Sequence, residues 1–232
     1  MAPSHLRVEH STAGYRQLLL ARPERRNALD LDLARALRDA LAEDGTAPVV
    51  LGSADPRVFC AGADLGVTDT DRAAVSDLVY ECCEILITRP GPVIAVVTGP
   101  AVGGGAQLAA AADLRIAGPA ARLRWIGPPG LGLAVGAWVL TDLVGRGAAM
   151  ELALTGRWVE AGEALAMGLV NRVEDDPGEA AAALAAELAA RSSSASARVK
   201  SVMSAAGLLD RLHAERQANR SAWAQATTPA GG

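Results

Sequence analysis

Two short segments rich in small residues carry the strongest chemical signal in this chain. One reads Phe-Cys-Ala-Gly-Ala-Asp-Leu over residues 59–65, and the other, residues 98–108, contains Gly103-Gly104-Gly105. Small residues let a backbone approach a ligand closely, and the first N–H groups of a helix have no acceptor within that helix. If each segment joins a strand to a helix, one backbone donor from each could hold a single oxygen on which negative charge develops.

Glycine-rich turns also occur in proteins for three reasons unrelated to an oxyanion. Close packing between a strand and a helix can by itself explain the glycines, and the spacing of the glycines does not exclude this explanation. A phosphate-binding loop is disfavoured because the run from Gly99 to Gly105 lacks the Gly-Lys-Ser/Thr ending. A dinucleotide-binding turn over residues 130–136 is disfavoured because Gly127-Pro128-Pro129 separates it from any β-rich strand.

The elements that must position these turns alternate between strand and helix, which predicts an α/β fold. After about residue 130 the pattern becomes largely helical. A serine run at residues 192–194 is the best candidate boundary, and we expect a core domain over 1–194 and a C-terminal helical region over 195–232. The expected strands are 6–8, 15–21, 49–52, 92–97, 114–117, 123–126 and 169–173, and the expected helices are 30–41, 70–88 (capped by Thr70 or Asp71), 106–112 and 179–191.

Composition narrows the class of protein. The chain has 232 residues, of which 50% are hydrophobic, and a net charge of −4 with no basic run, so a nucleic-acid-binding face is not expected. No signal peptide and no stretch of about 18 apolar residues is visible. Its three cysteines, Cys60, Cys82 and Cys83, match neither a disulfide framework nor a zinc motif. We therefore expect a cytoplasmic protein without a metal site.

Several blocks of the sequence, in order and spacing, resemble the enoyl-CoA hydratase/isomerase (crotonase) superfamily. The resemblance covers roughly residues 6 to 200, and separate blocks in the right order are far more specific than either glycine turn alone. The matching blocks are Arg22-Pro23-Glu24-Arg25-Arg26-Asn27-Ala28-Leu29, residues 59–65, Pro92 to Asp113, Leu154-Thr155-Gly156-Arg157 and Gly168-Leu169-Val170-Asn171-Arg172-Val173.

The resemblance implies a spiral of ββα units with a helical C-terminal trimerisation region. It further implies that the backbone N–H groups of Ala63 and Gly104 bind the thioester carbonyl of an acyl-CoA. Coenzyme A would enter as part of the ligand, with no other cofactor, and the expected assembly is a homotrimer or a dimer of trimers. The residues expected along the coenzyme A path are Arg26, Ala28, Ala61, Ala63, Asp64, Leu65 and Gly104. Among them, Asp64 is expected to fix the loop rather than to act as an acid. A solvated turn would explain Arg25 and Arg26 equally well.

The chain departs from that family at its acids. Family hydratases use two glutamates to activate water and to move a proton at the acyl α-carbon, work that needs titratable groups. With Asp113 setting the register, the first position holds Gln107, whose amide exchanges no proton near neutral pH. The second falls on Gly127 or Pro128, and the aspartate of dienoyl-CoA isomerases falls on Gly136. Weak or absent hydration is therefore expected.

A replacement acid could come from elsewhere in the chain. Glu81 and Glu84 lie on the helix expected to border the acyl pocket, although a solvated helix face is the simpler explanation for both. Trp125 and Trp138 flank the missing acid position and could line the pocket or pack in the core. The remaining candidates, His5, His10, His213 and Cys60, are expected to be surface or packing residues. Two classes of function follow: an enzyme that works through an enolate-like intermediate, and an acyl-CoA-binding protein without turnover.

Overall fold

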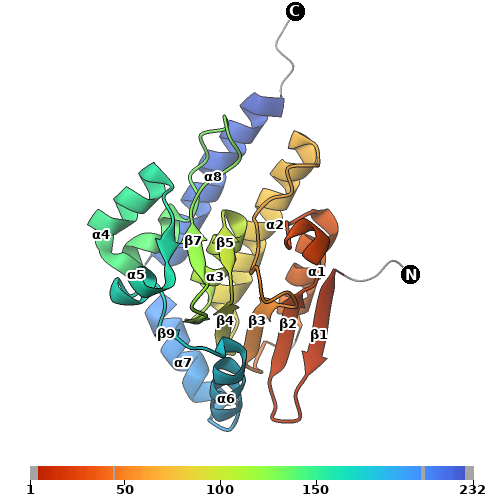
Figure 1. Cartoon of the computed structure of the whole chain (residues 1–232), viewed down its shortest axis with the longest axis vertical. Helices are drawn as coiled ribbons and strands as arrows, with labels where there is room; N and C mark the ends of the chain where they lie inside the picture. The colour runs from red at the N-terminus through yellow and green to blue at the C-terminus, as the bar shows by residue number, and fades with distance from the viewer. Residues whose placement is uncertain (1–4, 44, 205–206, 228–232) are drawn as a thin grey trace, which may run out of the picture.

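A computed structural model describes residues 5–43, 45–204 and 207–227 (Figure 1). Strands and helices alternate up to α4 (Ala137–Thr155), and the rest of the described chain is mainly helical. This arrangement confirms the α/β class. No helix within the described ranges combines the length and apolar character needed to cross a membrane.

The main sheet has six strands in the order β1-β2-β3-β4-β6-β9. Only the β1–β2 pair is antiparallel, and Ser11 closes this hairpin with a backbone bond to Tyr15 (2.9 Å). All five residues of β4 are buried, as expected for a parallel strand covered on both faces. The strands are β1 (Leu6–His10), β2 (Arg16–Leu20), β3 (Val49–Ser53), β4 (Val93–Val97), β6 (Leu114–Ala117) and β9 (Arg172–Val173).

A second, shorter row of extended segments follows the main strands and produces the predicted spiral of ββα units. β4 leads into β5 (Pro100–Val102) and then α3 (Gly104–Ala111), and β6 leads into β7 (Arg122–Arg124) and then α4. β5 pairs in parallel with β7, which pairs antiparallel with β8 (Val159–Glu160). Two isolated parallel bridges extend this row into the earlier turns of the spiral. They join Leu29 to Ala63 and Cys60 to Ala101. Successive coils therefore stack their second segments side by side.

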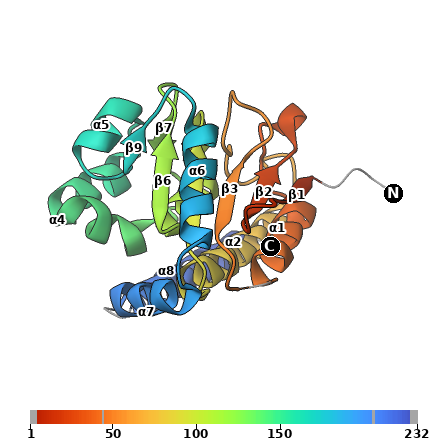
Figure 2. The same ribbon diagram turned by 90° about the horizontal axis from the view of Figure 1, so that it is seen from below.

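Helices cover both faces of the main sheet. α1 (Leu31–Ala42), α2 (Asp69–Thr88) and α3 enclose the larger core. The other face is covered by α6 (Pro177–Ala189), which lies between β6 and β3 in Figure 2 and buries Ala181 and Ala185 against Val50, Ile94 and Ile116. Small alanine side chains allow this helix to lie close to the strands.

Several expected boundaries were wrong. Residues 100–102 form β5 rather than part of a turn, because they pair in parallel with β7 on one side and bond to residues 59–60 on the other. α3 begins at Gly104 rather than at residue 106. α2 begins one residue before the expected start, since the Thr68 side chain caps it by accepting the Asp71 N–H. Of the expected strand at 169–173, only Arg172 and Val173 pair; the strand expected at 123–126 is β7, and the helix expected at 179–191 is α6.

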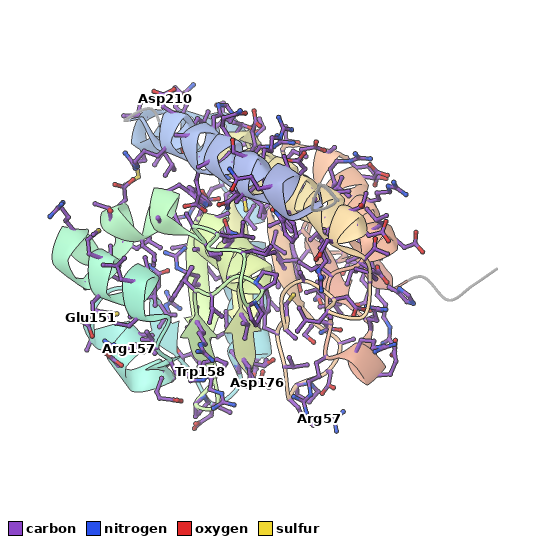
Figure 3. All side chains as sticks on the ribbon, turned by 90° about the horizontal axis from the view of Figure 1, so that it is seen from above. Arg57, Glu151, Arg157, Trp158, Asp176 and Asp210 are labelled. Atoms are coloured by element: carbon purple, nitrogen blue, oxygen red, sulfur yellow. The ribbon has the colours of Figure 1, made fainter. Side chains whose placement is uncertain are left out.

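The C-terminal helices pack against the core. α7 (Ser193–Ser204) is anchored by Lys200, whose buried ammonium donates to the Leu86 carbonyl (2.6 Å) and to the Asp113 carboxylate (2.8 Å). α8 (Leu208–Thr227) runs across the molecule from Asp210, beside α4, to α2 (Figure 3). The expected boundary after residue 194 falls within the first turn of α7, and the division into two domains stays a prediction.

Candidate functional site

A cavity of about 350 Å³ lies where the two small-residue turns meet α2, α8 and the loop before α4. Its wall is mostly apolar, as is usual for small-molecule sites. The lining residues come from six parts of the chain: Ala28, Leu29, Ala61, Gly62, Ala63, Leu65, Arg72, Val75, Ser76, Val79, Val102, Gly103, Gly104, Gln107, Ile126, Gly127, Pro128, Pro129, Leu133, Val135, Asn219 and Trp223.

The backbone N–H of Ala63 is left unpaired by the parallel bridge to Leu29. Leu29 donates to the Gly62 carbonyl (2.7 Å) and accepts from the Asp64 N–H (2.9 Å), so both of its bonds go to the neighbours of Ala63. Ala63 therefore directs its own N–H to the opposite side. Within the part of the chain that the structure describes, this donor has no acceptor, and Ala63 lines the cavity.

Gly104 supplies a comparable donor from the first turn of α3. Gly103 precedes it with φ 54° and ψ −119°, a backbone conformation that residues other than glycine rarely adopt. The Gly103 carbonyl accepts the backbone N–H of Gln107 (3.0 Å). No acceptor for the Gly104 N–H is found among the described residues. Since first-turn N–H groups point out of the helix and carry the positive end of its dipole, this donor suits an oxygen with negative charge.

Direct contact between the two turns sets the spacing of these donors. Val102 donates to the Cys60 carbonyl (2.9 Å), and a Cβ added at Gly62 would lie 3.7 Å from the Gly104 nitrogen. A Cβ at Gly105 would lie 2.6 Å from the Cβ and the carbonyl oxygen of Cys60, closer than real Cβ atoms approach. Glycine at this position is therefore required for α3 to reach the first turn.

The expected coenzyme A path is only partly assembled around the cavity. Ala28, Ala61 and Leu65 line it, and Leu65 is 63% exposed at its mouth. Arg26 has φ 53° and an exposed side chain outside the lining, so contact with coenzyme A and a solvated turn both stay predictions for it.

Asp64 also lies outside the lining and fixes the loop, the role expected for it. Its carboxylate accepts from the Gly66 N–H (2.8 Å) and pairs with Arg22 (2.7 Å). Burial pushes the pKa of Asp64 upward, but the Gly66 bond and the Arg22 guanidinium outweigh burial and leave that pKa below its usual value. Asp64 is thus held as a carboxylate away from the cavity.

The positions where the family resemblance places its acids do border the cavity. Gln107 is buried on α3, and its Oε1 accepts from the indole Nε1 of Trp138 (3.0 Å). Gly127 and Pro128 lie on the opposite wall. Trp125 and Trp138 are both buried in the core and do not line the cavity, so core packing is the role that holds for both.

Neither glutamate of α2 replaces these acids. Helix α2 presents Arg72, Val75, Ser76 and Val79 to the cavity, whereas Glu81 and Glu84 point away from that face. Glu81 pairs with Arg38 (3.4 Å) and Arg216 (3.1 Å), and Glu84 pairs with His213 (3.3 Å). Within the described lining, Arg72 is the only residue with an ionisable side chain, and it pairs with Asp69.

The remaining candidates lie away from the cavity lining. His5, His10 and His213 do not contribute to it. Cys60 is buried, and burial raises the pKa of its thiol to about 12, which disfavours the nucleophilic thiolate. Within the described ranges, no three His, Cys, Asp or Glu side chains are grouped to hold a metal ion.

Two lining residues of α8, Asn219 and Trp223, were missed from the sequence. Their i, i+4 spacing on one helix face is a signal, but it does not say which surface the helix covers. The Asn219 side chain donates to the Ala134 carbonyl (2.6 Å) and to the Tyr80 hydroxyl (2.8 Å). Helix α8 thereby fixes the loop before α4 as one wall of the cavity.

Glu215, one turn earlier on α8, completes this buried network. Its carboxylate accepts from the Tyr80 hydroxyl (2.9 Å) and from the backbone N–H groups of Gly136 (2.9 Å) and Trp138 (3.0 Å), at the start of α4. Burial raises the pKa of Glu215, and these hydrogen bonds oppose the shift. The carboxylate caps α4 and holds Trp138 beside Gln107.

Comparison with known proteins gives consistent results. Residues 11–229 match the enoyl-CoA hydratase/isomerase family profile. A Mycobacterium leprae protein named as a probable enoyl-CoA hydratase, echA6, is 37% identical over 169 residues, 69% of this chain and 68% of that protein. The crystal structure of an enoyl-CoA hydratase from Bacillus anthracis superposes with a TM-score of 0.80 at 31% identity, covering 95% and 90% of the two chains. That of an enoyl-CoA hydratase from Mycobacterium avium subsp. paratuberculosis superposes with 0.84 at 28% identity, covering 97% and 91%.

Proposed function

The chain belongs to the enoyl-CoA hydratase/isomerase family, and from that premise we propose that it binds an acyl-CoA without efficiently hydrating it. The thioester carbonyl oxygen lies between the backbone N–H groups of Ala63 and Gly104. Both donors lack a described acceptor and border one cavity, which is the observation that carries the proposal. Ala28, Ala61 and Leu65 line the approach of the pantetheine chain, and coenzyme A is needed only as part of the ligand.

The expected lack of hydration follows from the cavity wall. Addition of water to an enoyl thioester needs a group that takes up one proton and a group that delivers another. The described lining contains no Asp, Glu, His, Lys, Cys or Tyr, and its one arginine, Arg72, pairs with Asp69. Gln107 and Gly127 or Pro128 occupy the places where the family carries acids. Loss of such a group typically lowers a rate by about 10²–10⁴-fold.

The homotrimer, or dimer of trimers, remains part of the proposal. Helices α4 and α7 expose large apolar side chains that a subunit interface would cover, namely Met150, Leu154, Val199, Val202 and Met203.

Calorimetry with two matched ligands tests the carbonyl site. Butyryl-CoA and the thioether S-butyl-CoA share chain length and coenzyme A, but only the thioester offers a carbonyl oxygen. We expect butyryl-CoA to bind at least about fivefold more tightly, the effect of one net hydrogen bond. Equal affinities would remove the role of Ala63 and Gly104, and no heat with either ligand would overturn acyl-CoA binding.

Hydration is tested separately by following the conjugated thioester absorbance of crotonyl-CoA. Turnover near 10² s⁻¹, within the usual range of working enzymes, would contradict the proposal. The second candidate is an enzyme that stabilises an enolate, such as a decarboxylase of a 2-carboxyacyl thioester, because the same two donors would hold an enolate oxygen. Release of CO₂ from malonyl-CoA or methylmalonyl-CoA would favour this candidate.

A further inference from the structure

The Gln107–Trp138 hydrogen bond fixes which end of the Gln107 amide faces the cavity. An indole N–H can only donate, so the atom that it contacts must be the amide oxygen Oε1. Trp138 cannot move to reverse this choice, because it is buried and its backbone N–H is held by Glu215. The amide nitrogen Nε2 is therefore the free end.

The Nε2 group of Gln107 is available to a ligand. It has no hydrogen-bond partner among the described residues, and other atoms do not cover it completely. It is therefore open to the cavity that Gln107 lines. The two remaining long polar side chains of the lining are already engaged: Asn219 donates to Ala134 and Tyr80, and Arg72 pairs with Asp69.

Helix geometry places this donor over the proposed carbonyl site. Gln107 lies three residues after Gly104 on α3, so the two residues share one helix face. Side chains of a helix lean toward its N-terminus, which brings the Gln107 amide back over the turn whose N–H groups are exposed. A ligand whose thioester oxygen contacts Gly104 therefore passes its first acyl carbons beneath Nε2.

We propose that Gln107 makes this cavity selective for acyl groups that carry a carbonyl oxygen on C3, the 3-oxoacyl thioesters. This inference rests on the proposed acyl-CoA binding and names its substrate class. A glutamate in the same place would present a carboxylate oxygen, which repels an unprotonated oxygen of the ligand. The glutamine presents an N–H, which pairs with it. The replacement thus reverses the hydrogen-bonding preference of the position rather than merely removing an acid.

The test compares acetoacetyl-CoA with butyryl-CoA by calorimetry, since the two differ only in the C3 oxygen. The native protein is expected to prefer acetoacetyl-CoA by about 3- to 10-fold, the size of one net hydrogen bond. Gln107→Glu keeps the size of the side chain and an acceptor for Trp138, and it should abolish or invert the preference. Gln107→Met should bring the ratio near one. Gln217→Met, the same change on the exposed face of α8, should retain the native ratio.

The outcomes separate the two proposals. If both ligands bind the native protein equally, or if the preference survives in Gln107→Glu, selectivity by Gln107 is overturned while acyl-CoA binding stands. If neither ligand binds the native protein, acyl-CoA binding fails. If Gln107→Met does not fold, the isosteric Gln107→Glu decides the result.

Discussion

The ammonium of Lys200 on α7 lies 2.8 Å from the carboxylate of Asp113, which also accepts the N–H of Val93 at the start of β4 (2.7 Å). Lys200 is buried, and burial lowers its pKa, although Asp113 opposes the shift. The Asp113 side chain keeps 29% of its surface exposed. The pair thus joins the C-terminal helices to the central strand at the rim of the core.

Replacing Lys200 with methionine should destabilise the fold. The change leaves the Leu86 carbonyl and Asp113 without their ammonium partner. We expect a loss of about 1–3 kcal/mol in the free energy of unfolding, less than for a fully buried pair because Asp113 contacts solvent. Urea denaturation measures it, and Arg198→Met on the exposed face of α7 should change stability by less than about 0.5 kcal/mol. An equal effect of both variants would contradict the role of the pair.

Gly105→Ala should separate the two turns of the site. The added methyl would lie 2.6 Å from Cys60, so α3 must shift, at a cost of about 1–3 kcal/mol. Butyryl-CoA affinity should fall with stability, because the same shift displaces the Gly104 N–H. Gly147→Ala on α4 meets nothing within 4 Å and should stabilise the helix slightly, by up to about 1 kcal/mol. Unchanged stability and affinity in Gly105→Ala would show that the close contact is unimportant.

Glu215→Gln should destabilise the protein by about 1–3 kcal/mol. The three donors, Tyr80, Gly136 and Trp138, share both carboxylate oxygens, and the amide of glutamine has only one oxygen that can accept. The effect should depend on pH. The folded-state pKa of Glu215 is raised, so in the window above its ordinary value of about 4.3 the folded state holds a proton that the unfolded state has lost. The stabilisation from Glu215 relative to glutamine should therefore decrease as pH rises through that window.

Parallel urea denaturation of native protein and Glu215→Gln between about pH 4 and pH 7 measures this trend. Glu187→Gln, at an exposed position on α6, is the matched control and should show a small effect at every pH. A stability difference between native protein and Glu215→Gln that grows with pH would mean that the carboxylate is better stabilised in the fold than in water.

The three cysteines should resist alkylation in the native protein. All are buried, and burial raises the pKa of Cys60 and of Cys82 to about 12 and that of Cys83 well above its usual value. At pH 8 neither thiolate formation nor reagent access is favourable. Mass spectrometry after iodoacetamide should find no adduct without denaturant and three adducts in urea. Rapid native labelling of Cys60 would reopen a nucleophilic role.

Acids placed at the two positions where the family resemblance expects them should give some hydration. In Gln107→Glu, Trp138 can still hold one carboxylate oxygen. Pro128 is the better second position, because a Cβ at Gly127 would lie 3.1 Å from the Leu133 Cβ. The double variant Gln107→Glu/Pro128→Glu should hydrate crotonyl-CoA at least about tenfold faster than native protein, a modest part of the 10²–10⁴-fold typical of such groups. Gln217→Glu should give no increase, and a double variant that binds but matches the native rate would contradict the expectation.

Much of the fold could be predicted from the sequence, because the signals for these strands and helices lie within the segments themselves. The buried run of β4 and the apolar stripe of α1 follow directly from side-chain periodicity. The short strand β5 was missed, since three residues whose partners are the distant strand β7 and residues 59–60 carry no periodic signal. The start of α2 was misplaced because several adjacent polar residues could act as caps, and only the structure shows that Thr68 does.

The site was predictable where it depends on backbone and not where it depends on long-range packing. Small residues at 62–63 and 103–105 indicated where backbone N–H groups could stay free. The sequence could not show that Trp138 orients Gln107, because 31 positions separate them and a loop of undetermined path lies between. Nor could it show that Asn219 and Trp223 close the cavity, which depends on how α8 crosses α2 and α4.

The cavity wall combines residues from Ala28 to Trp223, so no single segment can form it without the others. A ligand held there has little to bind in the unfolded chain, and its binding energy adds to the free energy of unfolding. At a free ligand concentration 100 times Kd this addition is about 2.7 kcal/mol. The melting temperature of the protein is therefore itself a detector of occupancy, and an array of coenzyme A thioesters can be ranked by thermal shift before any reaction is known.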